Sequence, residues 1–524
     1  MKVNKESSFI YFVYPFAIEP TAVESRVKAI EEATCTVRSG EARRVWEPLN
    51  LPHEELIEHM GQYLNLTGDQ PATARVWRLS HDAARQFGID RSTKWRLLCP
   101  RGEIGFQFGR GDDLGFAVQL ALFHTGVGFL TVQIWLDSVE KADWMNLLHY
   151  FRFARGQRGV SVRAERRTVE RPPAESSNPQ PAGENQDTQS ASAQAASPKP
   201  PPEPKWVEFF PSEAEKHIPA GRKPFFLAVI HALLHTASRQ DGEPWWQEVF
   251  ISGQLIPFAT LYFETVPDFE TVPEQMVAET VYRVRNFFHM GQEVGLTEED
   301  KSLTHPKLLP YAQRMWFTFS LEGCAFVAIQ ARETDFFRRE LPDHLQRHYF
   351  LLFLIGLNQR FTLIRLSQEV SERWLQGDSR QRIETFERIH RLLMEFTARS
   401  YFSLVAQREH HQRFYSALQQ TLMVDTLYQE VKDEILEMYQ ALQREQSARI
   451  EHNQALQRQQ SMRLEQRVSF LTAFIAVPTA IFSFLNINIR SITSDTEGLP
   501  IAVAVGIAVL SMILGSIVWW LLKR

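Results

Sequence analysis

Two long apolar stretches lie near the C-terminal end of the sequence. The first covers residues 468–489 and the second residues 499–522, and neither contains Asp, Glu, Lys or Arg. A helix needs about 20 residues to cross the hydrocarbon core of a bilayer. A buried core helix is the alternative, but the length and purity of both stretches favour membrane spans. The short polar segment 490–498 between them predicts an antiparallel transmembrane hairpin with an external loop.

Charges around the two stretches predict their orientation. Basic residues precede the first stretch and follow the second: Arg463, Arg467, Lys523 and Arg524. The loop carries Arg490 together with Asp495 and Glu497. Because basic flanks favour the cytoplasmic side, we expect an integral protein of the inner or cell membrane with both termini in the cytoplasm.

Small and polar residues recur at helical spacing along the first stretch. They are Ser469, Thr472, Ala476, Thr479, Ser483 and Asn486. Successive spacings of three and four residues place them on one face of a helix, which we call the pore stripe. Such a face suits close packing between transmembrane helices. It also suits the lining of a pore by several copies, because polar groups inside a bilayer need protein or water beside them. Both interpretations stay open, and we favour the pore.

This region resembles the CorA-type magnesium transporters. The similarity consists of Pro478-Thr479 in mid-span, the C-terminal hairpin, the basic last residues, and a preceding run without Gly or Pro from Asp378 to Val477. That family ends its first span with Gly-Met-Asn. This chain has Asn486-Ile487-Asn488, which keeps the last Asn and replaces Gly and Met. The acid in the family's external loop corresponds to Glu497. The resemblance covers roughly residues 378–524.

The resemblance implies a funnel-shaped homopentamer with the first spans arranged around a central pore. It also implies that Asn486, Ile487 and Asn488 form the pore mouth, and that Mg²⁺ is the transported or regulatory ion. No enzymatic step is implied, and the chain itself shows no metal site that we can assign.

The segment before the first span predicts a long helical stalk. Apolar residues spaced by three and four form a coiled-coil-like seam: Val424, Leu427, Val431, Ile435, Met438 and Leu442. Beyond this seam the sequence is mostly Gln, Arg and Glu. Such a polar helix is either the wall of a hydrated vestibule or a solvated stalk. Arg458, Arg463 and Arg467 would form a basic collar that gates cations or meets anionic headgroups.

The rest of the chain predicts an α+β fold. We expect an N-terminal soluble α/β domain at 1–165, a linker at 166–205, a second soluble α/β domain at 206–345, and a helical region with the stalk at 346–467. Strands are predicted at 9–16, 116–123, 127–136, 255–265, 316–320 and 325–330. Helices are predicted at 21–32, 51–64, 139–155, 225–236, 277–288, 347–376 and 379–412.

The linker is predicted from composition alone. Residues 171–205 are rich in Pro, Ser, Ala and Gln and contain no Ile, Leu, Val, Met, Phe, Tyr or Trp. A segment of this kind cannot bury enough apolar surface to offset the entropy of ordering, so we expect disorder.

Two short segments resemble each other. Residues 125–133 (TGVGFLTVQ) align with residues 322–330 (EGCAFVAIQ), and each precedes a His-Tyr-Phe triplet, at 149–151 and at 348–350. A duplicated α/β module explains the match. The other explanation is coincidence between two hairpins, whose turns favour Gly in any case.

Candidate chemistry elsewhere is sparse. A net charge of −5 gives no basic footprint for nucleic acid. His231 and His235 have metal-ligand spacing but apolar neighbours, and a core role is favoured. The acidic groups 112–113 and 298–300 suit a hydrated divalent ion, although solvated loop charge is the simpler explanation.

Two functions follow from these patterns. The first is a CorA-like homo-oligomeric channel or transporter for divalent cations. The second is a ligand-gated CorA-like membrane effector, for example in antiviral defence, whose large cytoplasmic part senses a small molecule. A membrane-tethered scaffold without a pore is a third possibility.

Overall fold

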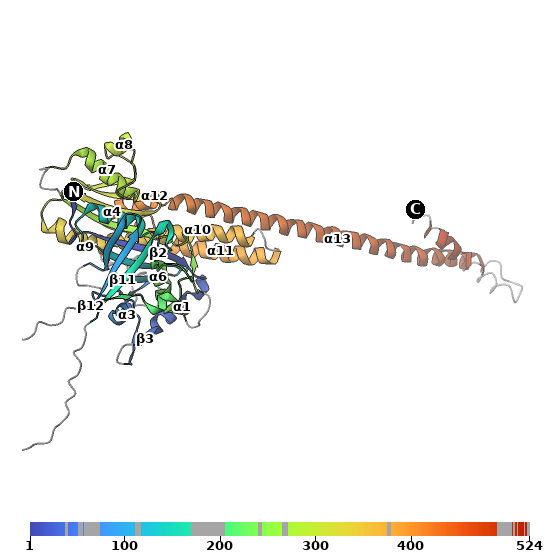
Figure 1. The fold of residues 1–524 in the computed structure, drawn as a ribbon. Helices are drawn as coiled ribbons and strands as arrows, with labels where there is room; N and C mark the ends of the chain where they lie inside the picture. The colour runs from blue at the N-terminus through green and yellow to red at the C-terminus, as the bar shows by residue number, and fades with distance from the viewer. Residues whose placement is uncertain are drawn as a thin grey trace, which may run out of the picture. The chain divides into compact units, whose positions relative to one another are not determined.

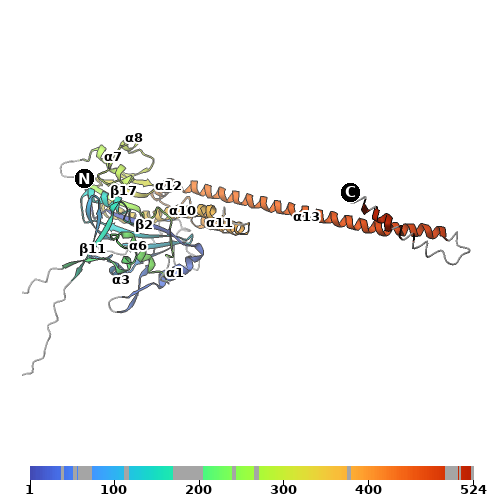
Figure 2. The same cartoon turned by 45° about the vertical axis from the view of Figure 1, so that its right-hand side comes forward.

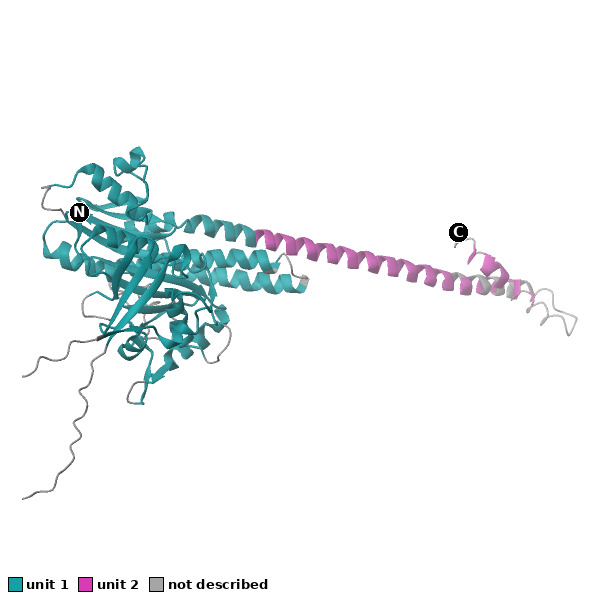
Figure 3. Cartoon of the chain, viewed as in Figure 1, with its two compact units in different colours: residues 1–435 teal, residues 436–524 magenta. Residues whose placement is uncertain are grey.

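The computed structural model describes residues 1–36, 40–50, 56, 74–110, 117–168, 205–238, 244–264, 271–374 and 379–489, with 506, 509–510, 512–517 and 519–520. The described chain forms two compact units, residues 1–435 and 436–524 (Figure 3). It is a mixed α+β protein with a long C-terminal helix, as predicted.

One sheet organises the first unit (Figure 1). Its central strands are β10 (Val127–Trp135), β2 (Phe9–Ala17), β14 (Ile256–Glu264) and β17 (Gly323–Ile329), in that spatial order. Beyond β10 follow β8 (Gly102–Phe108), β7 (Thr93–Cys99), β11 (Ser161–Thr168) and β12 (Lys205–Phe209). Beyond β17 follow β16 (Met315–Ser320) and β15 (Leu308–Ala312). The predicted soluble regions 1–165 and 206–345 therefore contribute to a single sheet.

Shorter strands complete this sheet. They are β1 (Lys2–Val3), β5 (Trp46–Pro48), β6 (Ala74–Leu79), β9 (Val118–Phe123) and β13 (Gln247–Glu248). Strands β3 (Thr34–Thr36) and β4 (Ala42–Arg44) pair separately.

Both faces of the sheet are buried, which explains the continuous apolar runs in its central strands. On one face Ile10, Phe12 and Phe16 join a core with helices α1 (Val23–Glu32), α3 (His81–Gln86), α4 (Lys141–Tyr150), α6 (Phe226–His235) and α7 (Glu274–Arg285). On the other face Tyr11 stacks on Phe350 with ring centroids 4.0 Å apart. That face is covered by α10 (Phe350–Glu369) and α12 (Glu409–Thr421).

Helices dominate the chain after the sheet. Short helical segments are η1 (Pro20–Ala22), η2 (Gln157–Gly159), α5 (Ser212–Glu215), α8 (Glu298–Lys301) and α9 (Leu341–His344). The π-helical turns η3 (Phe336–Glu340), η4 (Leu345–Tyr349) and η5 (Val370–Trp374) adjoin α9 and α10. Helix α11 (Ser379–Arg399) lies beside α10 in both views (Figures 1 and 2). The last helix is α13 (Val424–Ile489).

The predicted helix 379–412 divides in two. Helix α11 ends at Arg399 and α12 begins at Glu409, although no Gly or Pro lies between them. The amide of Gln359 donates a hydrogen bond to the carbonyl of Ser400, and the side-chain oxygen of Gln412 accepts from the backbone N–H of Val405. These tertiary bonds satisfy the backbone where the helix stops.

The first residues of the predicted linker, 166–168, belong to a strand. Residues up to Thr168 belong to β11, and β12 begins at Lys205, so Thr168 and Lys205 face each other as an antiparallel pair. Residues 169–204, on which the predicted disorder falls, lie outside the described residues. The predicted helix 51–64 lies almost wholly outside them as well.

The local repeat extends to a hairpin followed by a helix. Hairpins β9–β10 and β16–β17 precede α4 and α10, and the His-Tyr-Phe triplets lie at the end of α4 and the start of α10. The sheet pairing differs, because β10 is antiparallel to β2 whereas β17 is parallel to β14. The similarity therefore stops at the hairpin and its helix.

Within the described residues, one helical run is long and apolar enough to cross a membrane by length and composition. It is Phe336–Glu372, and 78% of its most apolar window is buried inside the protein. Because its apolar side chains pack in the first unit, this run is only weak evidence for a membrane.

Candidate pore-lining helix

Helix α13 carries the pore stripe. It has 66 residues, which corresponds to about 100 Å at 1.5 Å per residue. The helix continues through position 478, where Pro478 lies, and ends at Ile489. One continuous helix therefore joins the polar stalk to the first apolar stretch, as the sequence predicts.

The described members of the pore stripe are exposed. Ser469, Thr472, Ala476, Thr479 and Ser483 all present their side chains on the helix surface. The side chains of Asn486, Ile487 and Asn488 lie outside the described residues, as do Asp495 and Glu497, so the predicted pore mouth stays a prediction.

Two hydroxyls of the stripe have local partners. Thr472 Oγ1 donates to the carbonyl of Val468 at 2.8 Å, and Thr479 Oγ1 donates to the carbonyl of Ile475 at 2.6 Å. A threonine bonded in this way needs no partner from another helix. Its oxygen still has a lone pair with which to accept a hydrogen bond from water.

Other described side chains in this part of α13 are apolar and exposed. Leu471 is 56% exposed and Ile475 is 63% exposed. In the C-terminal segment Leu510, Met512 and Trp520 are more than half exposed as well. Contiguous apolar surface on this scale marks contact with lipid or with another protein.

The C-terminal segment lies against α13 within the second unit. The rings of Phe470 and Trp519 are 6.0 Å apart. A Cβ atom at Gly515 would lie 3.3 Å from the ring of Phe474. Because 470 lies near 519 and 474 lies near 515, the two segments run in opposite directions.

The exposure of the stalk side chains changes along its length. Most of the predicted seam is buried, with Val424, Val431 and Met438 at 2% exposed or less. From residue 443 onward almost every side chain is exposed, including the basic collar of Arg458, Arg463 and Arg467. A helix that is polar and bare over this length needs other helices or many local ion pairs to be stable.

The start of α13 is fixed by contacts to α10 and to the segment that follows α11. Tyr401 donates a hydrogen bond to Asp425 at 2.7 Å and stacks on Tyr428 at 4.2 Å. Ser367 of α10 donates to Glu434 at 3.1 Å. These contacts hold the first turns of α13 in place.

Helix α10 in turn contacts the β9–β10 turn through residues that the sequence analysis did not single out. Arg365 donates to the carbonyl of Ile18 and lies 3.7 Å from Glu369, which also pairs with Arg388 at 2.8 Å. Thr362 and Thr125 are hydrogen bonded and buried. No spacing in the sequence indicates the contact of Arg365 with Ile18 or that of Thr362 with Thr125, because each joins positions more than two hundred residues apart.

The sequence-predicted histidine pair belongs to a larger cluster. The ring of His217 stacks on His235 at 4.6 Å, and His231 lies 3.4 Å from the hydroxyl of Tyr14. Burial, only partly offset by Glu248, lowers the pKa of His231 to about 4. Face-to-face rings do not direct their nitrogen lone pairs at a common point. In the part of the chain that is described, no group of three His, Cys, Asp or Glu side chains is arranged to hold a metal ion.

The acidic group 298–300 has a structural role in the described fold. Asp300 is buried, forms an ion pair with Arg285 at 2.8 Å and closes a capping box with Thr297. Burial favours the protonated acid, but the hydrogen bonds from Thr297 and the charge of Arg285 outweigh it and lower the pKa of Asp300. The other predicted group, 112–113, lies outside the described residues.

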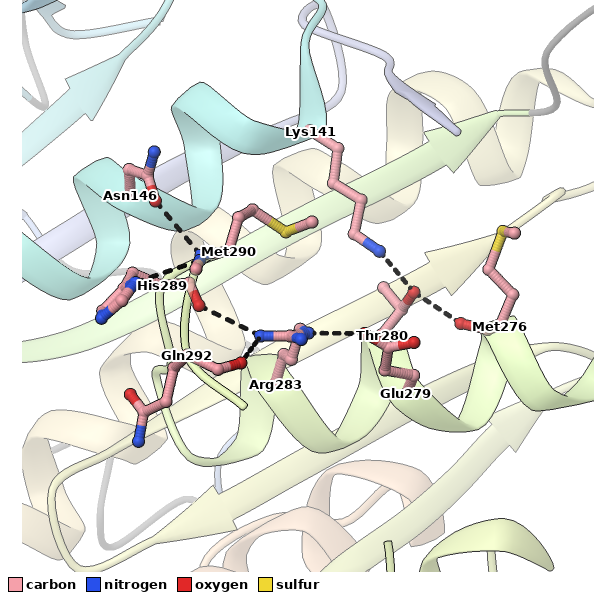
Figure 4. A network of polar contacts seen from close by, with 10 residues as sticks. Lys141, Asn146, Met276, Glu279, Thr280, Arg283, His289, Met290 and Gln292 are labelled. Atoms are coloured by element: carbon pink, nitrogen blue, oxygen red, sulfur yellow. Dashed lines mark hydrogen bonds and ion pairs between the residues drawn. The ribbon is translucent and has the colours of Figure 1, made fainter. Parts of the chain in front are cut away.

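A polar network joins α4 to α7 and to the loop that follows α7 (Figure 4). Arg283 donates to the carbonyls of His289 and Gln292, and Asn146 accepts from the backbone N–H of Met290. Lys141 donates to Thr280 at 2.8 Å. The network consists of satisfied pairs and holds the loop after α7 in place.

No family model, no curated protein and no solved structure matches this chain.

Proposed function

We propose that this protein is a homo-oligomeric membrane channel or transporter for cations, with the pore lined by the first span, residues 468–489. The second span is residues 499–522, both termini are cytoplasmic, and the loop 490–498 is external. The resemblance to CorA-type transporters makes a pentamer and a divalent cation such as Mg²⁺ the leading candidates. No catalytic step is part of this proposal.

The observation that carries the proposal is the distribution of side chains on α13. The small and hydroxylated residues share one face of an unbroken helix, and exposed apolar residues such as Leu471 and Ile475 occupy other faces. This arrangement fits a helix with lipid or the second span on one side and water on the other. The contacts of Phe470 with Trp519 and of Phe474 with Gly515 support the antiparallel hairpin.

A second candidate is a ligand-gated effector with the same pore. It is favoured by the size of the first unit and by the polar contacts that connect the β9–β10 turn to α10 and α10 to α13. Such contacts offer a route by which a small molecule bound in the first unit changes the pore.

Magnesium flux into liposomes tests the proposal. Full-length protein is reconstituted into vesicles loaded with a magnesium-sensitive dye, beside Asn488→Ala and protein-free vesicles. We expect entry through the wild type and reduced entry through the variant, because an amide oxygen at the mouth accepts hydrogen bonds from the hydration shell of the ion. Leakage that begins only after a cell-derived small-molecule fraction is added identifies the effector. Silence under both conditions contradicts both.

A further inference from the structure

The pore stripe continues into the stalk with its spacing unchanged. Counting back from Ser469 by four and then three residues, in alternation, gives eight positions. These fall into two series, and within each series successive positions are seven residues apart. One series is small or apolar: Ala441, Ala448, Ala455 and Met462. The other alternates in charge: Arg444, Glu451, Arg458 and Glu465. We call these eight positions the axial face.

The axial face is free in the single chain. All eight side chains are exposed. Residues seven apart on a helix are about 10.5 Å apart along its axis, and only neighbours three or four apart meet on its surface. The charges of this face therefore do not neutralise one another within one helix. By contrast, Glu445, which lies off this face, pairs with Arg449 at 2.8 Å.

We infer that parallel copies of α13 pack through the axial face, and that Glu465 forms a carboxylate ring at the cytoplasmic entrance of the pore and gives it a preference for cations. This inference rests on the proposed pore. Ala at one series allows the helices to approach closely. The alternation of sign at the other places the Glu451 and Arg458 rings each between two rings of the opposite charge, and places the Arg458 ring before the Glu465 ring.

The position of Glu465 decides the sign of the field at the entrance. It precedes Ser469 by four residues, about 6 Å, so it is the last charge of the axial face before the pore stripe. Rings of carboxylates at this place concentrate cations. Arg463 and Arg467 lie off the axial face, so of the predicted basic collar only Arg458 belongs to it.

Disulfide cross-linking tests the packing without any need for ion flow. Single cysteines are placed at Ala448 and Ala455 on the axial face, and at Asn453 on the opposite face as a matched control. The background is Cys35→Ser/Cys99→Ser in full-length protein in membranes, with the fully buried Cys324 kept. We expect Ala448→Cys and Ala455→Cys to form disulfide dimers and Asn453→Cys not to.

Two results overturn the packing. Cross-linking at Ala455→Cys alone would show that the helices pack antiparallel. In an antiparallel pair that places Arg444 beside Glu465 of the other copy, position 455 lies near position 455 of that copy, whereas the two positions 448 lie far apart. Equal cross-linking at Asn453→Cys, or none at either alanine position, would show that copies do not meet through the axial face.

Reversal potentials of reconstituted protein in a KCl gradient test the role of Glu465. We expect Glu465→Gln to lower the K⁺ to Cl⁻ permeability ratio several-fold. The double variant Glu465→Gln/Gln460→Glu keeps the net charge but moves the carboxylate to the outer face, and we expect it to behave like the single variant. An unchanged ratio in Glu465→Gln, or full recovery in the double variant, refutes the assignment. A wild type that conducts no ion refutes the proposed function instead, and the cross-linking still decides the packing.

Discussion

At the scale of single residues, His149 is a neutral imidazole held by the fold. Its Nδ1–H donates to the carbonyl of Phe287 at 2.7 Å, and its Nε2 lies 3.4 Å from Arg158 and accepts from it. Burial is the main reason that the pKa of His149 falls from 6.5 to about 4, and the neighbouring Arg152 adds to the effect. Protonation therefore removes stability from the folded state.

The pH dependence of stability follows from this depressed pKa. The unfolded chain binds the proton more tightly, so the contribution of His149 is complete above pH 6.5 and is lost as the pH falls through 6.5 toward 4. At pH 5 the loss is about 2 kcal/mol. We expect His149→Asn, which keeps a donor for Phe287, to reduce the fall in melting temperature between pH 7 and pH 5. An equally steep fall in the variant would show that His149 is not buried in its neutral form.

At the scale of elements, the β9–β10 turn packs tightly against the backbone that follows β2 and against Arg365 of α10. Gly126 has φ +82, and a Cβ atom there would clash with the carbonyl oxygen of Ile18 and lie 2.7 Å from Nη1 of Arg365. Gly40 has the same φ of +82 with nothing within 4 Å of its Cβ position. The two glycines thus share a backbone conformation that would strain any residue with a Cβ atom, and they differ in packing.

Alanine at these two positions separates the two effects. We expect Gly40→Ala to cost about 1 kcal/mol of stability from strain alone. Gly126→Ala should cost about 2–4 kcal/mol, because the turn must also move away from the backbone carbonyl of Ile18. Thermal unfolding of the two purified variants beside the wild type gives the comparison. Equal shifts in melting temperature would mean that the turn does not lie close to the backbone of Ile18.

Elements with continuous apolar runs could be predicted, and those with mixed composition could not. Strand β2 (FIYFVYPFA) is buried over its whole length, and its aromatic and β-branched residues predicted it. Strand β7 (TKWRLLC) was missed because Lys94 and Arg96 point outward and interrupt the apolar pattern. The end of α11 was missed because the side chains that bond the backbone there come from other helices. Gln359 lies on α10 and Gln412 lies on α12.

In the candidate site, too, local features could be predicted and long-range contacts could not. Helical spacing was enough to predict the pore stripe on α13, because that face is local in sequence. The contacts of Arg365 and Thr125 that connect the sheet to α10 were not predictable, because only the folded chain brings them together.

At the scale of the whole molecule, the two units differ in what they bury and what they expose. The first unit buries both faces of its sheet and holds the start of α13 through Asp425 and Glu434. The second unit exposes apolar surface and the described residues of the pore stripe. The proposed assembly of several copies in a membrane covers both features.

Cysteine accessibility along α13 tests most directly whether the pore stripe faces water in a conducting pore. Ser483→Cys and Thr479→Cys on the stripe are compared with Leu471→Cys, which is off the stripe and 56% exposed in the single chain. All three are reconstituted in the Cys35→Ser/Cys99→Ser background and treated with a charged thiol reagent during ion flux. We predict that flux through the two stripe variants is blocked while flux through Leu471→Cys continues. Equal block of all three, or block of Leu471→Cys alone, would contradict a pore lined by this face.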